Sequence, residues 1–196
     1  MLKLKVDFKS IFKKGVKTIQ NDSLVALITG VMGSGKTYYA IKKLEDIKST
    51  KHIITNVRSY RSSHHNVEYI LHISEIYDNH DPDTIFLIDE LSKIYVKDSK
   101  IDRAFYSWLQ QSRKHNRQVY LITQEYLQVP QWLRGVANYV YTTHRFFKNF
   151  CITSFGYPVL DKDSMEWGLS EISLEFYKRT KSIASKYDTM ELINTL

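Results

Sequence analysis

The sequence predicts an α/β fold in which a mainly parallel sheet is flanked by helices. Short apolar runs of strand length alternate with segments of helical periodicity along residues 23–146, as in domains built from strand, helix and strand units. A glycine-rich loop joins the first of these strands to the first helix, and polar residues follow several strands. Residues 1–22 form a basic segment before this core, and residues 147–196 form a smaller hairpin or helical extension of the same domain.

Length and composition fit one folded domain. The chain has 196 residues, of which 43% are hydrophobic and 25% are charged, values typical of a globular protein with its own core. Its single cysteine, Cys151, has no partner for an internal disulfide. The chain opens without a tripartite secretory leader, and no apolar run approaches the roughly 20 residues of a spanning helix. We therefore expect a cytoplasmic protein with no integral membrane segment.

The elements of the core can be placed one by one. A helix is expected from the glycine-rich loop to about Ile47, and a second one over residues 101–116, where Phe105 and Trp108 share a face. Residues 148–162 are expected to form an antiparallel hairpin around the turn Gly156-Tyr157-Pro158. Strands are expected in the runs LVALIT, KHIITNV, TIFLIDE, QVYLIT and YVYTTHR, with a weaker extended segment in VEYILHI.

The net charge of +7 is concentrated at the amino terminus, where the first 20 residues hold six lysines and one aspartate. Apolar residues recur there at helical spacing, which predicts a basic amphipathic helix. Such a helix is equally compatible with docking on the core and with contact to DNA, lipid or a partner protein. Charge alone does not decide between these alternatives.

The stretch GVMGSGKT has the pattern of a phosphate-binding loop, or Walker A motif. It follows an apolar strand and opens a helix, which is the context that this motif requires. Backbone N–H groups of such a loop surround the phosphates, Lys36 reaches the terminal phosphates, and the Thr37 hydroxyl binds Mg²⁺. The residues expected to bind ATP are Gly30, Val31, Met32, Gly33, Ser34, Gly35, Lys36 and Thr37.

Two further polar groups follow apolar strands and complete the expected site. TIFLIDE supplies Asp89 for the magnesium shell and Glu90 to polarise an attacking water. QVYLITQE supplies Gln124 to sense the γ-phosphate or to orient that water. The carboxyl ends of parallel strands meet at one edge, where open α/β sheets bind ligands. The adjacent Asp-Glu pair favours hydrolysis over the transfer of phosphate to a second substrate, which is the reaction of the alternative, a nucleoside kinase.

Together, GVMGSGKT, FLIDE and LITQ resemble the additional-strand (ASCE, RecA-like) P-loop ATPases, and within them the HerA/FtsK superfamily. FLIDELSKIY, and the stretch from WLQQSRKHNR to VYTTHR, are similar to its Zot-like and viral genome-packaging branch. The resemblance covers residues 24–145 and implies an ATP- and Mg²⁺-dependent homo-oligomer, a pentameric or hexameric ring that moves double-stranded DNA. It also implies an arginine supplied by the neighbouring subunit, for which the candidates are Arg134, Arg117 and Arg113.

The chain lacks a feature of each of two groups of proteins in this branch and its neighbours. It shows no membrane-spanning segment of the kind that filamentous-phage proteins carry after the ATPase domain, and no acidic cluster suited to the nuclease of large terminases. We therefore expect a small phage packaging motor in the host cytoplasm that attaches transiently to a capsid portal or connector. The alternative is a Zot-like assembly or secretion ATPase that acts at a membrane surface.

Overall fold

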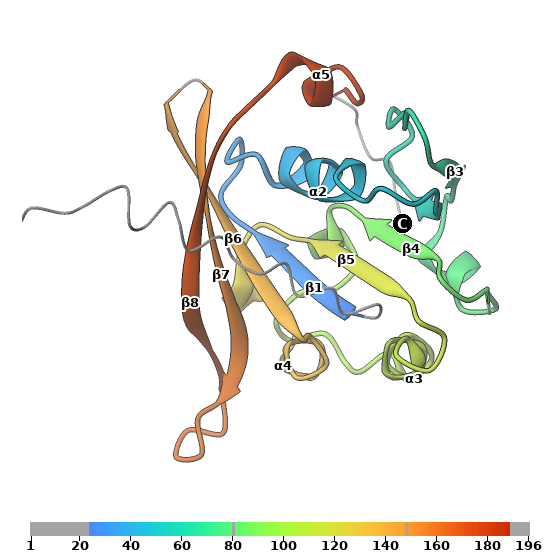
Figure 1. Cartoon of the computed structure of the whole chain (residues 1–196). Coiled ribbons are helices and arrows are strands. Elements are labelled where there is room, and N and C mark those ends of the chain that lie inside the picture. Colours follow the sequence, from blue (N-terminus) through green and yellow to red (C-terminus); the bar gives the residue numbers. More distant parts are fainter. Residues whose placement is uncertain (1–23, 80, 148, 189–196) are drawn as a thin grey trace, which may run out of the picture.

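The computed structural model describes residues 24–79, 81–147 and 149–188, so the predicted amino-terminal helix lies outside the described part. One sheet of eight strands, in the order β3-β2-β4-β5-β1-β6-β7-β8, runs through the domain (Figure 1). Its first six strands along the chain are mutually parallel. They are β1 (Leu24–Thr29), β2 (His52–Thr55), β3 (Asn66–Tyr69), β4 (Ile85–Ile88), β5 (Gln118–Ile122) and β6 (Tyr139–Phe147). The predicted mainly parallel α/β fold is confirmed.

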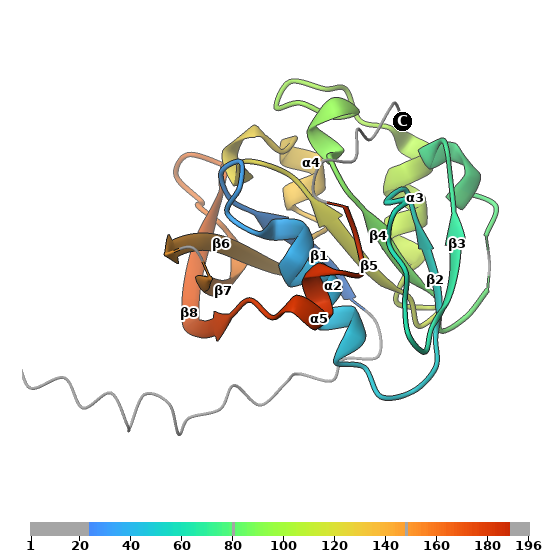
Figure 2. The same ribbon diagram turned by 90° about the horizontal axis from the view of Figure 1, so that it is seen from above.

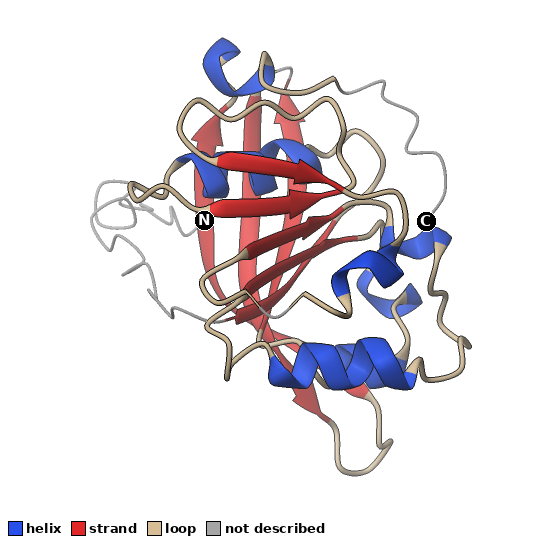
Figure 3. Cartoon of the chain, turned by 90° about the vertical axis from the view of Figure 1, so that its right-hand side faces the viewer, coloured by secondary structure: helices blue, strands red, loops and turns tan. Residues whose placement is uncertain are grey.

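Helices cover both faces of the sheet (Figures 1 and 3). Helix α2 (Lys36–Glu45) packs on one face, and α3 (Arg103–Gln111) and α4 (Gln131–Arg134) pack on the other. Successive side chains of a strand point to opposite faces, so β1 contributes Ala26 to the α2 side and Leu27 to the α3 side. Three short 3₁₀ helices complete the connections: η1 (Ile73–Ile76), η2 (Leu91–Lys93) and η3 (Tyr126–Gln128).

Most of the apolar stripe predicted for residues 101–116 is buried between α3 and the sheet, whereas Ile101 precedes the helix and is 45% exposed. Phe105, Trp108 and Leu109 face the sheet from α3, and the Trp108 ring meets Phe86 of β4 edge-on. The helix begins at a capped end, because the Asp102 carboxylate accepts hydrogen bonds from two backbone N–H groups of the first turn at 3.0 Å each. No helix within the described ranges is long and apolar enough to cross a membrane.

The carboxyl-terminal part adds two long antiparallel strands, β7 (Phe150–Leu160) and β8 (Trp167–Lys178). The predicted turn at Gly156-Tyr157-Pro158 is therefore wrong, because these residues lie inside β7 and pair with β8. The chain turns instead at residues 161–166, where the Asp161 carboxylate accepts a hydrogen bond from the N–H of Asp163 at 2.9 Å. Gly156 serves a close approach of two strands: the register shifts there, and a Cβ would collide with the Ser170 carbonyl.

After β8 the chain crosses helix α2 (Figure 2). The backbone N–H of Thr180 donates to the Tyr38 hydroxyl at 2.9 Å, just before α5 (Lys181–Ala184) begins. Further along, Lys186 forms an ion pair with Glu45 at 2.9 Å. These contacts hold the end of the described chain against the helix that starts at the phosphate loop.

The role of Gly156 predicts a clear stability difference between two glycines of the same ribbon. Gly156→Ala forces its methyl group into the β8 backbone and is expected to lower the free energy of unfolding by roughly 1–3 kcal/mol. Gly168→Ala is the matched control, because its Cβ would meet only the Val159 carbonyl at 3.7 Å. We expect it to change stability by less than about 0.5 kcal/mol. Urea unfolding measures both, and equal effects would contradict this account.

Candidate functional site

The predicted phosphate loop spans residues 30–37, between the end of β1 and the start of α2. Its path depends on glycine at two points. Gly30 has φ 144°, and a Cβ there would collide with the Thr143 carbonyl and the Ser34 hydroxyl. Gly35, at the N-cap of α2, has φ 98°. Side chains other than glycine rarely adopt these angles, so the sequence pattern and the loop conformation require each other.

Neighbouring strands on both sides hold this loop in place. On the β5 side, the Gly30 N–H donates to the Gln124 carbonyl at 2.9 Å. On the β6 side, the Thr143 hydroxyl donates to the Thr29 carbonyl at 3.1 Å and lies 2.8 Å from the Ser34 hydroxyl. Since the Thr143 proton is used on Thr29, Ser34 is the donor in that pair. Contacts within the protein thus hold both Gly30 and Ser34 of the loop.

The two predicted metal residues meet directly. The Thr37 hydroxyl, at the start of α2, donates to Asp89 Oδ2 at 2.7 Å. Asp89 follows β4 and is buried, and Asn56 after β2 braces its main chain. The Asn56 amide donates to the Asp89 carbonyl at 2.9 Å and accepts from the Asp89 N–H at 2.8 Å. Sequence reasoning missed Asn56, because it placed this residue inside the expected strand KHIITNV.

This pair offers the oxygen ligands that Mg²⁺ prefers. Mg²⁺ is usually held by one or two protein oxygens together with waters and substrate phosphates, and a hydroxyl 2.7 Å from a carboxylate fits that requirement. Among the described residues there is no cluster of three or more His, Cys, Asp or Glu side chains that could hold a metal by itself. Waters and nucleotide phosphates are the usual remaining ligands of a Mg²⁺ held in this way.

Lys36 and Asp89 are both held in surroundings that oppose their charge. Burial lowers the pKa of Lys36, an effect that the nearby carboxylates of Asp89 and Glu90 offset in part. Burial likewise raises the pKa of Asp89, against the hydrogen bonds from Thr37 and from the Glu90 N–H. The Lys36 ammonium donates to the loop carbonyls of Gly30 at 2.8 Å and Val31 at 3.2 Å. A multiply charged anion in this loop would stabilise the charged form of Lys36.

Glu90 and Gln124 follow adjacent strands of the same edge. Glu90 has a left-handed backbone with φ 55°, a rare conformation for a non-glycine residue. Its half-exposed carboxylate forms an ion pair with Lys93 at 2.5 Å. Gln124 is exposed at the end of β5, and its carbonyl holds Gly30. The fold thus gathers Lys36, Thr37, Asp89, Glu90 and Gln124 at the carboxyl edge of the sheet.

The three candidate arginines are not equivalent. Arg117 is completely buried: its guanidinium stacks 5.2 Å from the Trp108 ring and donates to the Asn79 carbonyl. Arg134 is 3% exposed, lies over the Tyr126 ring and donates to the Trp167 carbonyl at 2.9 Å. Neither placement fits the predicted role of reaching a neighbouring subunit, because both guanidinium groups are enclosed within their own chain.

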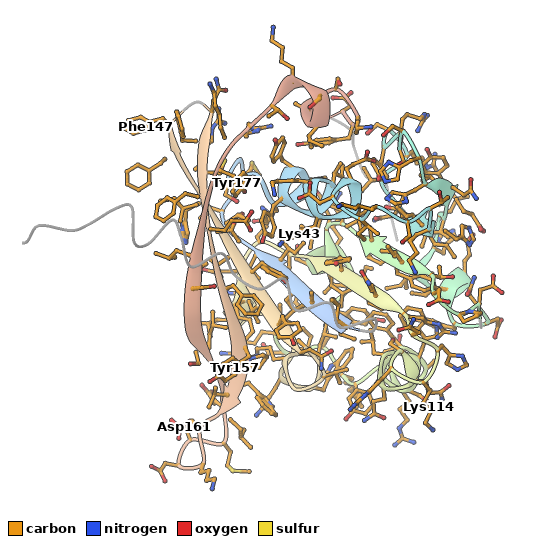
Figure 4. The ribbon with its side chains drawn as sticks, viewed as in Figure 1. Lys43, Lys114, Phe147, Tyr157, Asp161 and Tyr177 are labelled. Carbon is orange, nitrogen blue, oxygen red and sulfur yellow. The ribbon has the colours of Figure 1, made fainter. Side chains whose placement is uncertain are left out.

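Arg117 directly precedes β5, whereas the phosphate loop follows the carboxyl end of the parallel strand β1. Burial lowers its pKa. Arg113 is exposed four residues earlier. Figure 4 shows its neighbour Lys114 beside α3, on the face of the sheet opposite to α2. Of the three arginines, Arg113 alone is accessible.

Comparisons with known proteins identify a family and agree with the fold. The family model described as "Zonular occludens toxin (Zot)" matches residues 24–188. The N-terminal domain of zonular occludens toxin from Neisseria meningitidis superposes with a TM-score of 0.60 at 19% identity, covering 85% of this chain and 99% of that one. The genome packaging NTPase B204 from Sulfolobus turreted icosahedral virus 2, in complex with sulfate, gives 0.51 at 15% identity, covering 76% and 96%. No curated protein sequence matches.

A structural role for Arg117 predicts a loss of stability on its removal. Arg117→Ala leaves a cavity beside Trp108 and removes the donor to the Asn79 carbonyl, so we expect a destabilisation of roughly 2–4 kcal/mol. Arg113→Ala, the exposed control, should stay within about 0.5 kcal/mol. Urea unfolding gives both values. Unchanged stability of Arg117→Ala with a specific loss of phosphate release would instead restore its catalytic assignment.

Proposed function

Because this chain belongs to the zonular occludens toxin (Zot) family, and because its phosphate loop meets an acidic strand end, we propose that it is a Mg²⁺-dependent ATPase. The observation that carries this proposal is the 2.7 Å contact between Thr37 and Asp89. It joins the residue types that hold a nucleotide-bound Mg²⁺ in P-loop NTPases. A glycine-rich turn of purely structural use has no need of a buried carboxylate beside its threonine.

In this proposal each residue at the edge has one task. Lys36 exchanges its loop carbonyls for the terminal phosphates of ATP, and backbone N–H groups at the start of α2 and in the loop before it surround those phosphates. Thr37 and Asp89 would hold Mg²⁺ there, Thr37 through its hydroxyl and Asp89 through its carboxylate. The half-exposed Glu90 carboxylate takes the proton of the attacking water, and Gln124 orients that water. Mg²⁺ supplies charge neutralisation for the phosphates when it is bound.

We further propose that hydrolysis moves double-stranded DNA and that the active form is a homomeric ring. The net charge of +7 supports a polyanionic load, and the genome packaging NTPase B204 shares the fold. Exposed lysines at Lys97, Lys100 and Lys114 are candidates for phosphate contacts. Arg113, the accessible candidate, is the proposed arginine in trans. We also propose that the ring attaches to a capsid through a portal or connector.

Family membership also favours a second candidate function. The Zot match is compatible with an assembly or secretion ATPase that acts on protein at a membrane surface. The chemistry at Lys36, Thr37 and Asp89 is the same in both cases, so the load must be identified by experiment. The two functions differ in whether duplex DNA accelerates hydrolysis.

The assignment of the water-activating residue predicts separate effects on binding and hydrolysis. Glu90→Gln is expected to bind ATP like the wild type but to release phosphate about 100-fold more slowly or worse, because the general base is lost. Lys36→Ala should weaken ATP binding at least about tenfold, as a direct phosphate contact disappears. Titration with a fluorescent ATP analogue and a phosphate-release assay measure the two steps.

Glu125→Gln is the matched control, because this exposed carboxylate follows the same edge one residue after Gln124. It should hydrolyse ATP at the native rate. Native hydrolysis by Glu90→Gln itself would remove Glu90 from the mechanism.

A DNA motor predicts that long duplex DNA stimulates phosphate release. Stimulation should be strong at about 50 mM salt and fall steeply by about 200 mM, because each phosphate contact releases counterions. The measurement is phosphate release with and without linear duplex, with Glu90→Gln as the blank. Absence of stimulation at protein concentrations that permit assembly would favour the membrane-associated function.

A further inference from the structure

One end of the β6-β7-β8 ribbon carries an exposed apolar surface. We define the phenylalanine edge as Phe146, Phe147, Phe150, Leu174 and Phe176. These side chains are 67%, 69%, 53%, 53% and 45% exposed. Figure 4 shows Phe147 at this end of the ribbon and Asp161 at the other. Contiguous apolar patches of this kind mark interaction sites on folded proteins.

This edge is also cationic. Residues 144–150 and 176–187 contain no aspartate or glutamate, whereas exposed basic side chains include Arg145, Lys178 and Lys181. The nearest acidic side chain in β8, Glu175, points to α2, where it pairs with Lys42 at 3.2 Å and Lys43 at 3.6 Å. A surface that covers this edge must therefore offer apolar contact together with negative charge.

The other outermost strand of the sheet lies in an acidic region, opposite in charge to the phenylalanine edge. β3 is the outermost strand on that side, and residues 66–83 contain five acidic residues and neither lysine nor arginine. Exposed apolar side chains lie among them, with Tyr69 at 38% and Leu71 at 49%. We define this acidic edge by its exposed carboxylates, which are Glu68, Glu75, Asp78, Asp81 and Asp83. Within the chain, Glu68 pairs with His52 at 3.0 Å and Asp83 with Lys51 at 3.9 Å.

We propose that the acidic edge of a second copy of this chain docks on the phenylalanine edge. The inference rests on the proposed function, because it names the contact that would build the proposed ring. Two identical edges facing each other would bring like charges together, whereas opposite edges attract. The contact is heterologous, because each copy offers its acidic edge to one neighbour and its phenylalanine edge to the other. Copies therefore add head to tail, and they form a ring when the rotation between neighbouring copies closes.

The docking surface lies beside the nucleotide site. Thr143 of β6 contacts Ser34 of the phosphate loop, and the loop tip exposes Val31 at 71% and Met32 at 83%. Strand β6 therefore links the phosphate loop to the phenylalanine edge, which begins three residues after Thr143. We favour a second copy as the partner rather than an anionic lipid surface. The chain itself carries an acidic surface at residues 66–83, and binding to lipid would not involve it.

Charge exchange between the edges tests the proposal. Lys178→Glu with Lys181→Glu reverses the phenylalanine edge, and Glu68→Lys with Asp78→Lys reverses the acidic edge. None of these residues belongs to the nucleotide site. Sedimentation velocity with ATP should show the wild type assembling, and each reversed variant should need at least about tenfold more protein to assemble. An equal mixture of the two variants should recover assembly, since each then offers the charge that the other lacks.

An apolar test runs beside the charge test. Phe147→Ser with Phe150→Ser should weaken assembly to a similar degree. Tyr157→Ser with Val159→Ser is the matched control, because these side chains are 42% and 43% exposed on β7 beyond the phenylalanine edge. The control should assemble like the wild type.

Three results would overturn the proposal in distinguishable ways. Reversed variants that assemble like the wild type, with native phosphate release, refute the docking faces and leave the proposed ATPase ring intact. A wild type that stays monomeric with ATP and duplex DNA refutes both the docking and the ring. The proposed ATPase activity is tested separately, by phosphate release. Flotation of a monomeric wild type with anionic vesicles, lost in Phe147→Ser with Phe150→Ser, identifies the edge as a lipid surface.

Discussion

The close approach of Gly30 to Thr143 is the constraint on which the rest of the site depends. Only glycine leaves room for the Thr143 carbonyl and the Ser34 hydroxyl, so β1 and β6 fix the start of the phosphate loop between them. From this fixed start, α2 begins with Thr37 directed at Asp89. The same strand, β6, continues to the phenylalanine edge, so the nucleotide loop and the proposed docking surface share one support.

The sequence predicted the elements of the candidate site because their positions follow from a simple geometric rule. Polar residues that follow parallel strands meet at one edge of the sheet, and Asp89 accordingly lies beside Thr37. The bracing by Asn56 was not predicted, because a single polar residue after a strand does not reveal which neighbour it will face. Arg117 was misplaced for a related reason: a guanidinium in a basic segment carries no signal of burial, yet this one stacks on Trp108.

The carboxyl-terminal ribbon shows where local signals mislead. Gly156-Tyr157-Pro158 has the composition of a turn, but glycine also serves where two strands approach closely, and that use prevails here. Pro158 lies two residues beyond Gly156, in a part of β7 that pairs with β8 but no longer with β6, so one side of the strand is open there. Only the long-range pairing with β8 distinguishes these uses, and such pairing cannot be read from adjacent residues.

The central position of β1 has a consequence for biosynthesis. Leu24 pairs with Gln118, 94 residues further along the chain, and Ala26 pairs with Tyr139. At translation rates of about 5–20 residues per second, the strand that carries the phosphate loop waits roughly 5–20 s for its first neighbour. During that time its apolar side chains and those of α2 have no sheet to cover them. The nascent chain is therefore most vulnerable to aggregation before β5 emerges, and chaperone contact is expected in that interval.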